Sequence, residues 1–505
     1  MTTTSDAALG AGTLPVFRPG RRSRAFAGVI SLLALLTLVV DLAWAIMAGQ
    51  FFLLQLPIFL GSLFLLLFFG LGYIINPPPW VGVFALSLLY FAQDFTLRQG
   101  LVGGGGTDLQ SMVKGLIAAL LLGYGLFNGL SKTTRHPVLG WWLAYALFAA
   151  FTASYSSAKA LGIGSGMALI GIALGTAQAA SRSEKGLAAY WVGMYSAAVL
   201  ASVLSLILLA TLPMMARDLA DPGAFRLRGV TGSANSLGPI MAVGIIIGLS
   251  MFKRAQGAWW KRLHGVFILT LLVALVLTNS RSSMIGAVAG VAAVAVIRRQ
   301  QGILTLLMVA LGASLAAVTL LIPSLMKNLA ALVVEFVSRS GNVHEITSFT
   351  GRSDIWVASV KLIQAKLWFG YGLGSVRVEL PKVFFDAWGN TTTTAHNYVL
   401  ESMISVGLVG TLMLTVVFVM ATVGLLRFVG SAVSPFRSEE TKEWSVCALR
   451  CIMMLWVHSL VERAFAGTAA PSTVVLGLCV ATYVFVALQV REAGQRRMAR
   501  IQALG

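Results

Sequence analysis

Arginine and histidine are the residue types in this sequence that could do chemistry on a phosphorylated substrate. Arg352 lies in a polar segment, residues 323–395, that interrupts an otherwise apolar sequence, and His396 directly follows it. A guanidinium stays charged at any working pH and offers a planar fork of donors that suits phosphate oxygens. A neutral imidazole can accept a proton. The two residues together predict a site that holds phosphate and moves a proton.

Three further arginines lie in polar connections between apolar runs. Arg226 and Arg228 belong to FRLRG, and Arg281 belongs to TNSRSS, between runs that end at Leu277 and resume at Met284. A charge between two apolar runs costs free energy unless water or a partner stabilises it, so Arg281 is a functional candidate. The alternatives are that Arg281 extends to lipid headgroups and that Arg226 and Arg228 are solvated in a loop.

His396 and its neighbour Asn397 stand at the entrance of the apolar run that follows the polar segment. A neutral imidazole there could act as a general base toward a hydroxyl group. The alternative is that His396 or Asn397 only caps the helix that follows. The outer polar segments contain no DxD pair, no metal-ligand spacing, no P-loop and no GxSxG, so we predict a site without a metal or cofactor.

Membrane helices must position these residues. The chain is 57% hydrophobic and 11% charged, with a mean hydropathy of +0.85, whereas a soluble domain has about a quarter of its residues charged. Runs such as 29–47, 51–75, 190–212 and 402–426 reach the length of about 20 residues that spans a bilayer. We predict an all-α polytopic transmembrane bundle of about 12–14 spans with a large outer loop, residues 323–395.

The net charge of +19 follows from membrane topology and not from nucleic-acid binding. Lys and Arg gather in short connectors, all on one side when the apolar runs are counted, which is the positive-inside pattern. Both termini are therefore expected in the cytoplasm, and the polar segments 213–232 and 323–395 outside. The basic clusters are residues 18–24, 132–135, 182–185, 253–262, 298–299, 437–442 and 491–500.

The sequence divides into four expected regions. A disordered cytoplasmic tail (1–25) precedes an N-terminal transmembrane bundle (26–212). A second membrane domain (213–490) carries the candidate residues and the loop 323–395, and a basic cytoplasmic tail (491–505) ends the chain. Within the loop, apolar residues at helical spacing predict an amphipathic helix over 353–368, lying at the outer surface and followed by a break at GYGLG.

Four stretches in chain order carry a resemblance to a known family. They are FRLRGVTGSANSLGP, TNSRSS, GRSDIW with the later LWFGYGLGS, and AHNYVLESMISVGLVG. Together they resemble the signatures of the O-antigen ligase and O-antigen polymerase superfamily, which includes Wzy-type and exopolysaccharide polymerases of bacterial envelopes. The resemblance covers roughly residues 225–426. The first stretch lacks the proline common before the family's asparagine (SANS here), which leaves the register of its arginine open.

The resemblance implies a C-type glycosyltransferase-like membrane enzyme whose active site faces the periplasm from the inner membrane. It implies metal-independent transfer of a glycan from an undecaprenyl-pyrophosphate donor, with inversion if the displacement is direct. The family's essential arginines fall on Arg228 or Arg226, on Arg281 and on Arg352, and its histidine on His396, with Asn397 in support.

The acceptor separates the two activities that the resemblance implies. It would be a second lipid-linked glycan in a polymerase, to which a chain-length regulator could bind, or a lipid A core in a ligase. The number of spans favours a polymerase of O-antigen or exopolysaccharide. Membrane lipids are the remaining expected partners.

A transporter or flippase of lipid-linked oligosaccharides is the alternative from another class. It would use Asp41, Asp94 and the pair His458 and Glu462, whose spacing places both on one helix face. Such proteins bind substrate near the bilayer midplane on broken helices, often within internal repeats. The chain shows no repeat, and its candidate residues gather at one outer face, which favours the enzyme.

Overall fold

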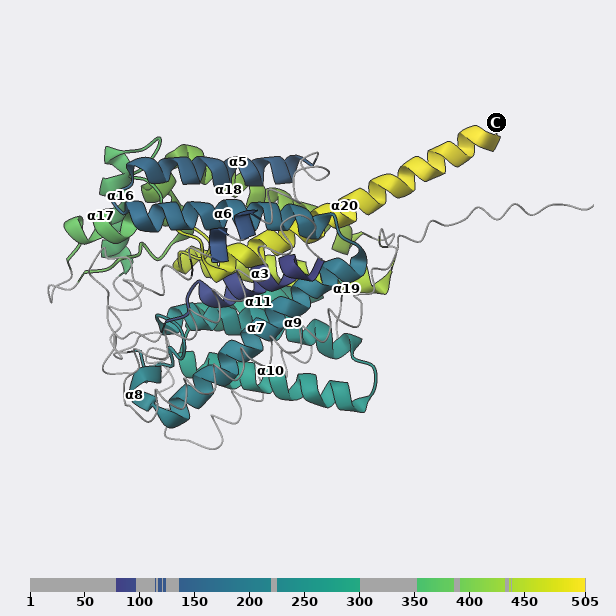
Figure 1. The fold of residues 1–505 in the computed structure, drawn as a ribbon, viewed down its shortest axis with the longest axis horizontal. Coiled ribbons are helices and arrows are strands. Elements are labelled where there is room, and N and C mark those ends of the chain that lie inside the picture. The colour runs from purple at the N-terminus through teal and green to yellow at the C-terminus, as the bar shows by residue number, and fades with distance from the viewer. Residues whose placement is uncertain are drawn as a thin grey trace, which may run out of the picture. The chain divides into compact units, whose positions relative to one another are not determined.

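A computed structural model describes residues 79–96, 114, 117–119, 121–123, 136–218, 225–299, 352–385, 391–431, 436 and 438–504. All of them belong to one compact unit, residues 69–505. Apart from turns and two isolated β-bridges, the described residues are helical (Figure 1). The helices are α3 (Pro79–Ala92), α5 (Pro137–Thr152), η1 (Ala153–Tyr155), α6 (Lys159–Ala180), α7 (Glu184–Thr211), α8 (Pro213–Ala216), α9 (Ala234–Arg254), α10 (Ala258–Thr278), α11 (Arg281–Ile297), α16 (Arg352–Ala365), α17 (Val376–Val383), α18 (Tyr398–Gly430), α19 (Glu439–Val461) and α20 (Pro471–Leu504).

The predicted all-α polytopic membrane fold is confirmed. Within the described residues, eight helices are long and apolar enough to cross a bilayer, and α3 and α11 are shorter apolar helices. The eight spans are 137–155, 159–180, 184–211, 234–254, 258–278, 398–430, 439–461 and 471–502. The tail 1–25, Asp41 and residues 323–351 of the predicted outer loop lie outside the described residues.

Helices α11 and α19 pack closely because two glycines of α11 face the backbone of α19. The helices are antiparallel, since the later glycine of α11 meets the earlier residues of α19. A Cβ on Gly290 would lie 2.4 Å from the carbonyl oxygen of Arg450, and one on Gly286 would meet Met454 and His458. Small residues at such positions let membrane helices approach closely. By the same register, the N-terminus of α11 lies level with the C-terminus of α19, one turn beyond His458.

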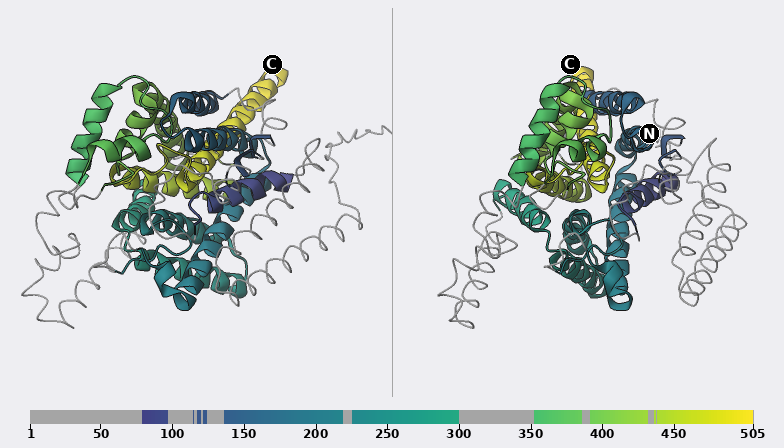
Figure 2. Two further views of the ribbon diagram at one scale, coloured as in Figure 1. Left: turned by 60° about the vertical axis from the view of Figure 1, so that its left-hand side comes forward. Right: turned by 90° about the vertical axis from the view of Figure 1, so that its left-hand side faces the viewer.

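The two ends of α19 define two ends of the bundle. At the first, which we name the Glu443 end, acidic residues at the start of α19 pair with basic residues where α9 and α11 end. The pairs are Lys253–Glu443, Arg254–Glu440 and Arg298–Glu443. Described residues of three predicted basic clusters thus lie at the same end: Lys253 and Arg254, Arg298, and Lys442. The other, which we name the Glu462 end, carries α16, α17 and the start of α18, drawn in green in Figure 2.

Helix α16 confirms the helix expected at 353–368, although it begins at Arg352 and ends at Ala365. Its buried face packs against α17 and α18 in one apolar cluster. The buried members of the cluster are Ile355, Ala358, Leu362, Ile363, Val376, Leu380, Phe384, Ala395 and Ile404. Helix α16 runs alongside the start of α18, since Trp356 near its beginning binds Ala395 and Leu367 just beyond its end binds Leu408.

Helix α18 is broken at Gly407, where φ is +67° and ψ is −171°. The segment after α16 fills the gap with its own backbone. The amides of Tyr371 and Gly372 donate to the carbonyls of Ile404 and Ser405, and those of Leu408 and Val409 donate to Leu367 and Trp368. The GYGLG break makes this approach possible, because its three glycines all have positive φ.

Candidate active site

The candidate site forms around Glu462, the first residue after α19. Its backbone leaves the helix at φ −142° and ψ 157°, and its side chain is only 8% exposed. Three side chains from different segments bind its carboxylate. Arg352 Nη2 lies 2.7 Å and Asn235 Nδ2 3.0 Å from Oε1, and His396 Nδ1 lies 3.0 Å from Oε2. One buried acid therefore joins α9, α16, α18 and α19.

The last carbonyls of α19 receive donors from the same neighbourhood. Arg352 Nη1 donates to the carbonyl of Val461, and Asn397 Nδ2 donates to that of Leu460 at 2.9 Å. The last four carbonyls of a helix have no partner within it, and a cation near them is favourable. Arg352 and Asn397 therefore also stabilise the end of α19.

Asn397 has a second role as the N-cap of α18. Its Oδ1 accepts hydrogen bonds from the amides of Val399 at 2.9 Å and Leu400 at 3.2 Å. The capping alternative considered for this position therefore describes Asn397. His396 takes no part in the cap and faces Glu462.

The backbone of His396 is held in the left-handed region, with φ of +49°. A non-glycine residue there carries strain that only the surrounding contacts can maintain. The preceding residue, Ala395, is clamped on both sides. Its carbonyl accepts from Trp356 Nε1 at 3.1 Å, and its amide donates to the buried carboxylate of Glu401 at 2.7 Å. These contacts fix the imidazole toward Glu462.

Of the two FRLRG arginines, Arg226 is the one that connects to Glu462. Its Nη2 donates to Asn235 Oδ1, and Asn235 in turn donates to Glu462. Its Nε donates to the carbonyl of Thr278 at 3.3 Å, at the end of α10. The side chain is buried, at 4% exposure.

Arg228 contacts α8 and not the neighbourhood of Glu462. Its Nε donates to the carbonyl of Met215 in α8 at 2.9 Å, and the residue is as buried as Arg226. Burial lowers its pKa, and the charge of Asp218 opposes that shift.

Arg281 is the first residue of α11. The preceding turn contains Asn279 in the left-handed conformation, and Thr278 before it contacts Arg226. The antiparallel packing of α11 on α19 places the backbone of Arg281 level with Glu462.

The charges around Glu462 keep its carboxyl ionised. Burial alone raises the pKa, but the charge and hydrogen bond of His396 and the charge of Arg352 outweigh it and lower the pKa to about 2. An ionised carboxylate has no proton to donate, so the hydrogen in the contact with His396 belongs to Nδ1. In the neutral form of the imidazole, Nε2 then carries the lone pair that a general base requires.

Within the described ranges, no three His, Cys, Asp or Glu side chains gather to hold a metal ion. The chemistry that the described side chains can perform is anion binding by guanidinium groups beside a histidine base. Asn235 is absent from the sequence-based candidates, and Glu462 appears there only with His458 in the transporter alternative. A glutamate followed by Arg463 between two apolar runs is a signal that could have found Glu462.

Comparison with known proteins agrees with the motifs. The family described as O-antigen ligase (Wzy_C) matches residues 266–415. The match contains Arg281, Arg352, His396 and Asn397, and it excludes FRLRG and Glu462. No curated protein matches the sequence. Residues 266–415 thus carry an O-antigen ligase family domain, and the resemblance to the O-antigen ligase and polymerase superfamily is confirmed.

Proposed function

We propose that this protein is a membrane glycosyltransferase that transfers or polymerises glycan units from an undecaprenyl-pyrophosphate donor. The observation that carries the proposal is the convergence of Arg352, His396 and the Arg226–Asn235 pair on Glu462. The match to the O-antigen ligase family supports activity of the ligase or polymerase type.

In the proposed reaction, Arg226, Arg281 and Arg352 bind the pyrophosphate of the donor, whereas Arg228 binds α8. Negative charge grows on the pyrophosphate as it leaves, and guanidinium groups stabilise charge at that place. Arg352 already has one carboxylate partner, so the leaving group shares that arginine with Glu462.

His396 is the proposed base. Its Nε2 takes the proton from an acceptor hydroxyl, whose oxygen attacks the anomeric carbon. The bond from that carbon to the pyrophosphate oxygen breaks as the new glycosidic bond forms. Direct attack from the opposite face inverts the anomeric carbon. Glu462 accepts the Nδ1 hydrogen, so it orients the imidazole and stabilises the imidazolium that forms, as the aspartate of a serine-protease triad does.

We place this chemistry on the periplasmic face of the bacterial inner membrane, with both termini in the cytoplasm. The gathering of three basic clusters at the Glu443 end, away from Glu462, supports this orientation. The acceptor is a second lipid-linked glycan in the polymerase that we favour, or a lipid A core in a ligase.

Two of the acids that the transporter alternative would use, Glu462 and Asp94, are paired with other residues. Glu462, which it would pair with His458, binds His396 and Arg352. Asp94 pairs with Arg463 at 3.9 Å, in the connection that follows Glu462. The break in α18 is closed by backbone hydrogen bonds from the segment after α16, so it offers no open backbone to a substrate.

Purified protein and a defined lipid-linked oligosaccharide test the proposal, with product size read on a gel. The wild type is expected to lengthen or transfer the glycan, and His396→Ala and Arg281→Ala are expected to lose that activity. Unaltered transfer by both variants would overturn the proposal. Addition of lipid A core as acceptor distinguishes the ligase from the polymerase.

A further inference from the structure

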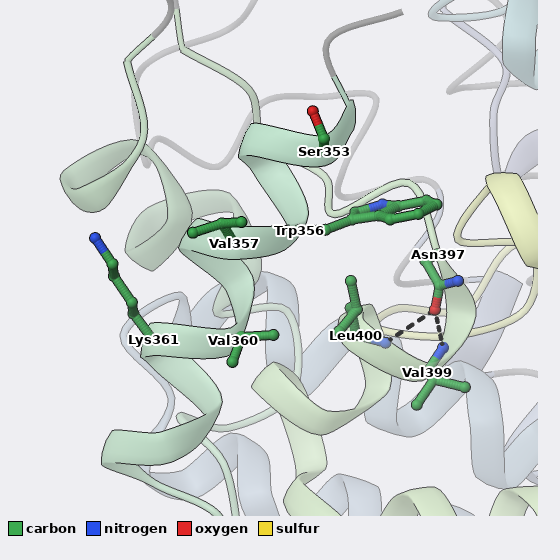
Figure 3. Close-up of a pocket in the computed structure, with 8 residues that line it drawn as sticks. All are labelled: Ser353, Trp356, Val357, Val360, Lys361, Asn397, Val399 and Leu400. Carbon is green, nitrogen blue, oxygen red and sulfur yellow. Dashed lines mark hydrogen bonds between the residues drawn. The ribbon is translucent and has the colours of Figure 1, made fainter. Parts of the chain in front are cut away.

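A groove between α16 and the start of α18 lies directly beside the candidate site (Figure 3). It has a volume of about 680 Å³ and is open to the outside. Its walls are mainly apolar, and its lining residues are Ser353, Trp356, Val357, Val360, Lys361, Asn397, Val399 and Leu400. Val357 and Val360 are exposed along α16, so apolar surface faces outward here.

One end of the groove opens at the site. Ser353 and Asn397 both line the groove, with the Trp356 ring between them in Figure 3, and each follows a site residue in the chain, Arg352 and His396. Asn397 is fixed there, because its side chain caps α18 and binds the end of α19. A ligand that lies along the groove therefore reaches the arginine and histidine with one end.

The other end of the groove leads toward the bilayer. Beyond α16 the exposed side chains of Leu367, Trp368 and Phe369 lie beside the break in α18. Residues 408–430 after the break are about 34 Å long as a helix, which alone crosses a hydrocarbon core of about 30 Å. The part of α18 before Gly407, and α16 with it, then stand above the core, with Trp368 and Lys366 at the boundary where such residues are enriched.

We propose that this groove holds the polyprenyl chain of the lipid-linked donor where the chain leaves the bilayer for the active site. The inference rests on the proposed function. The groove joins an apolar wall to a cationic end, which matches a lipid whose hydrocarbon chain is attached directly to a pyrophosphate. Lys361 in the lining and Arg352, next to the lining residue Ser353, supply the charge that complements it. A phospholipid would place two acyl chains here and no sugar near His396.

Kinetics with donors of two chain lengths test the groove. Val360→Asp puts a charge on its wall, and Val383→Asp puts the same charge on an exposed valine at the end of α17, outside the groove. We expect Val360→Asp to lower the preference for a long-chain donor over a short, water-soluble one at least tenfold, through KM. Val383→Asp is expected to keep the wild-type preference. An unchanged preference in Val360→Asp overturns the proposal.

Photocrosslinking reports on the same groove without catalysis. A photoreactive amino acid replaces Val360 or Val383, and the protein is illuminated in bilayers of phosphatidylethanolamine and phosphatidylglycerol that contain radiolabelled undecaprenyl phosphate. Labelling from position 360 and not from 383 supports the proposal, and capture of phospholipid alone at 360 overturns it. Labelling at 360 in a protein that transfers no glycan would refute the proposed function and leave the groove as a polyprenyl-phosphate site.

Discussion

The two ends of α19 use the same residue types in different ways. At the Glu443 end, Lys253 and Arg254 in the last turn of α9 meet acids near the start of α19. Each charge there also complements the dipole of its own helix. At the Glu462 end the acid has left the helix, and its partners include a histidine in a left-handed conformation.

The difference shows how an ion pair that joins helices is distinguished from one that belongs to a site. At the Glu443 end the paired charges lie where regular helices end. Arg299 after α11 is left-handed there, but it belongs to none of these ion pairs. The Glu462 end holds His396 at a conformation that costs about 1–3 kcal/mol and fixes it by the contacts of Trp356 and Glu401 to Ala395. We propose that this residue is held in place for its chemistry. Four measurements test this contrast.

The largest effect is expected for His396→Ala. Loss of the general base should lower kcat about 10³-fold, whereas the thermal midpoint in detergent should fall little because Arg352 and Asn235 still bind the carboxylate of Glu462. Initial rates with the lipid-linked donor measure kcat, and a thermal-shift assay measures the thermal midpoint. A variant that retains the wild-type kcat would mean that His396 has only a structural role, like the ion pairs at the Glu443 end.

Acid stability comes next. The pKa of Glu462 is lowered to about 2 from its ordinary value of 4.5. A lowered folded-state pKa stabilises the protein above the ordinary value, and this contribution is lost as the pH falls from about 4.5 to 2, amounting to about 3 kcal/mol. Unfolding followed across this range should show the loss in wild type. Glu462→Gln, which has no carboxyl to protonate, should show a flatter profile, and identical profiles would contradict the assignment.

The third comparison sets Glu462→Gln against Glu443→Gln in activity. The amide at 462 no longer stabilises an imidazolium, so kcat should fall about 10²-fold with a changed pH–rate profile, whereas KM for the donor changes little. Glu443→Gln, at the opposite end, should keep kcat within about twofold of the wild type. Equal losses in both variants would mean that the two acids are equivalent.

The smallest effect is on stability at the Glu443 end. Glu443→Gln removes the acid shared by Lys253 and Arg298. The Lys253 side chain is 57% exposed, so water compensates much of the loss, and we expect a destabilisation of about 1 kcal/mol. Urea or thermal unfolding in detergent measures it, with Lys442→Ala, which breaks the exposed pair with Glu439, as a control near zero.

The sequence predicted what depends on local pattern. Apolar runs predicted the membrane helices, apolar spacing predicted α16, and residue type singled out Arg352 and His396, which the structure brings to one carboxylate. The domain boundaries and the roles of the candidate residues stay predictions.

The parts that were not predicted depend on where helices stop. The four-residue spacing of His458 and Glu462 suggested one helix face, but α19 ends at Val461 and turns Glu462 toward His396. Gly467 and Pro471 mark the connection that follows and could have shown this end. Glycine is common in membrane helices, so the presence of Gly407 did not reveal the break in α18.

The break at Gly407 also imposes an order on biosynthesis. The amides and carbonyls on either side of it lack their helical partners, and a buried backbone group without a partner costs free energy. Their partners, residues 367–372, precede α18 in the chain. The segment must therefore already have emerged outside when α18 leaves the translocation machinery. A deletion between α16 and α17 would then trap α18 during membrane insertion, before any fully folded protein exists.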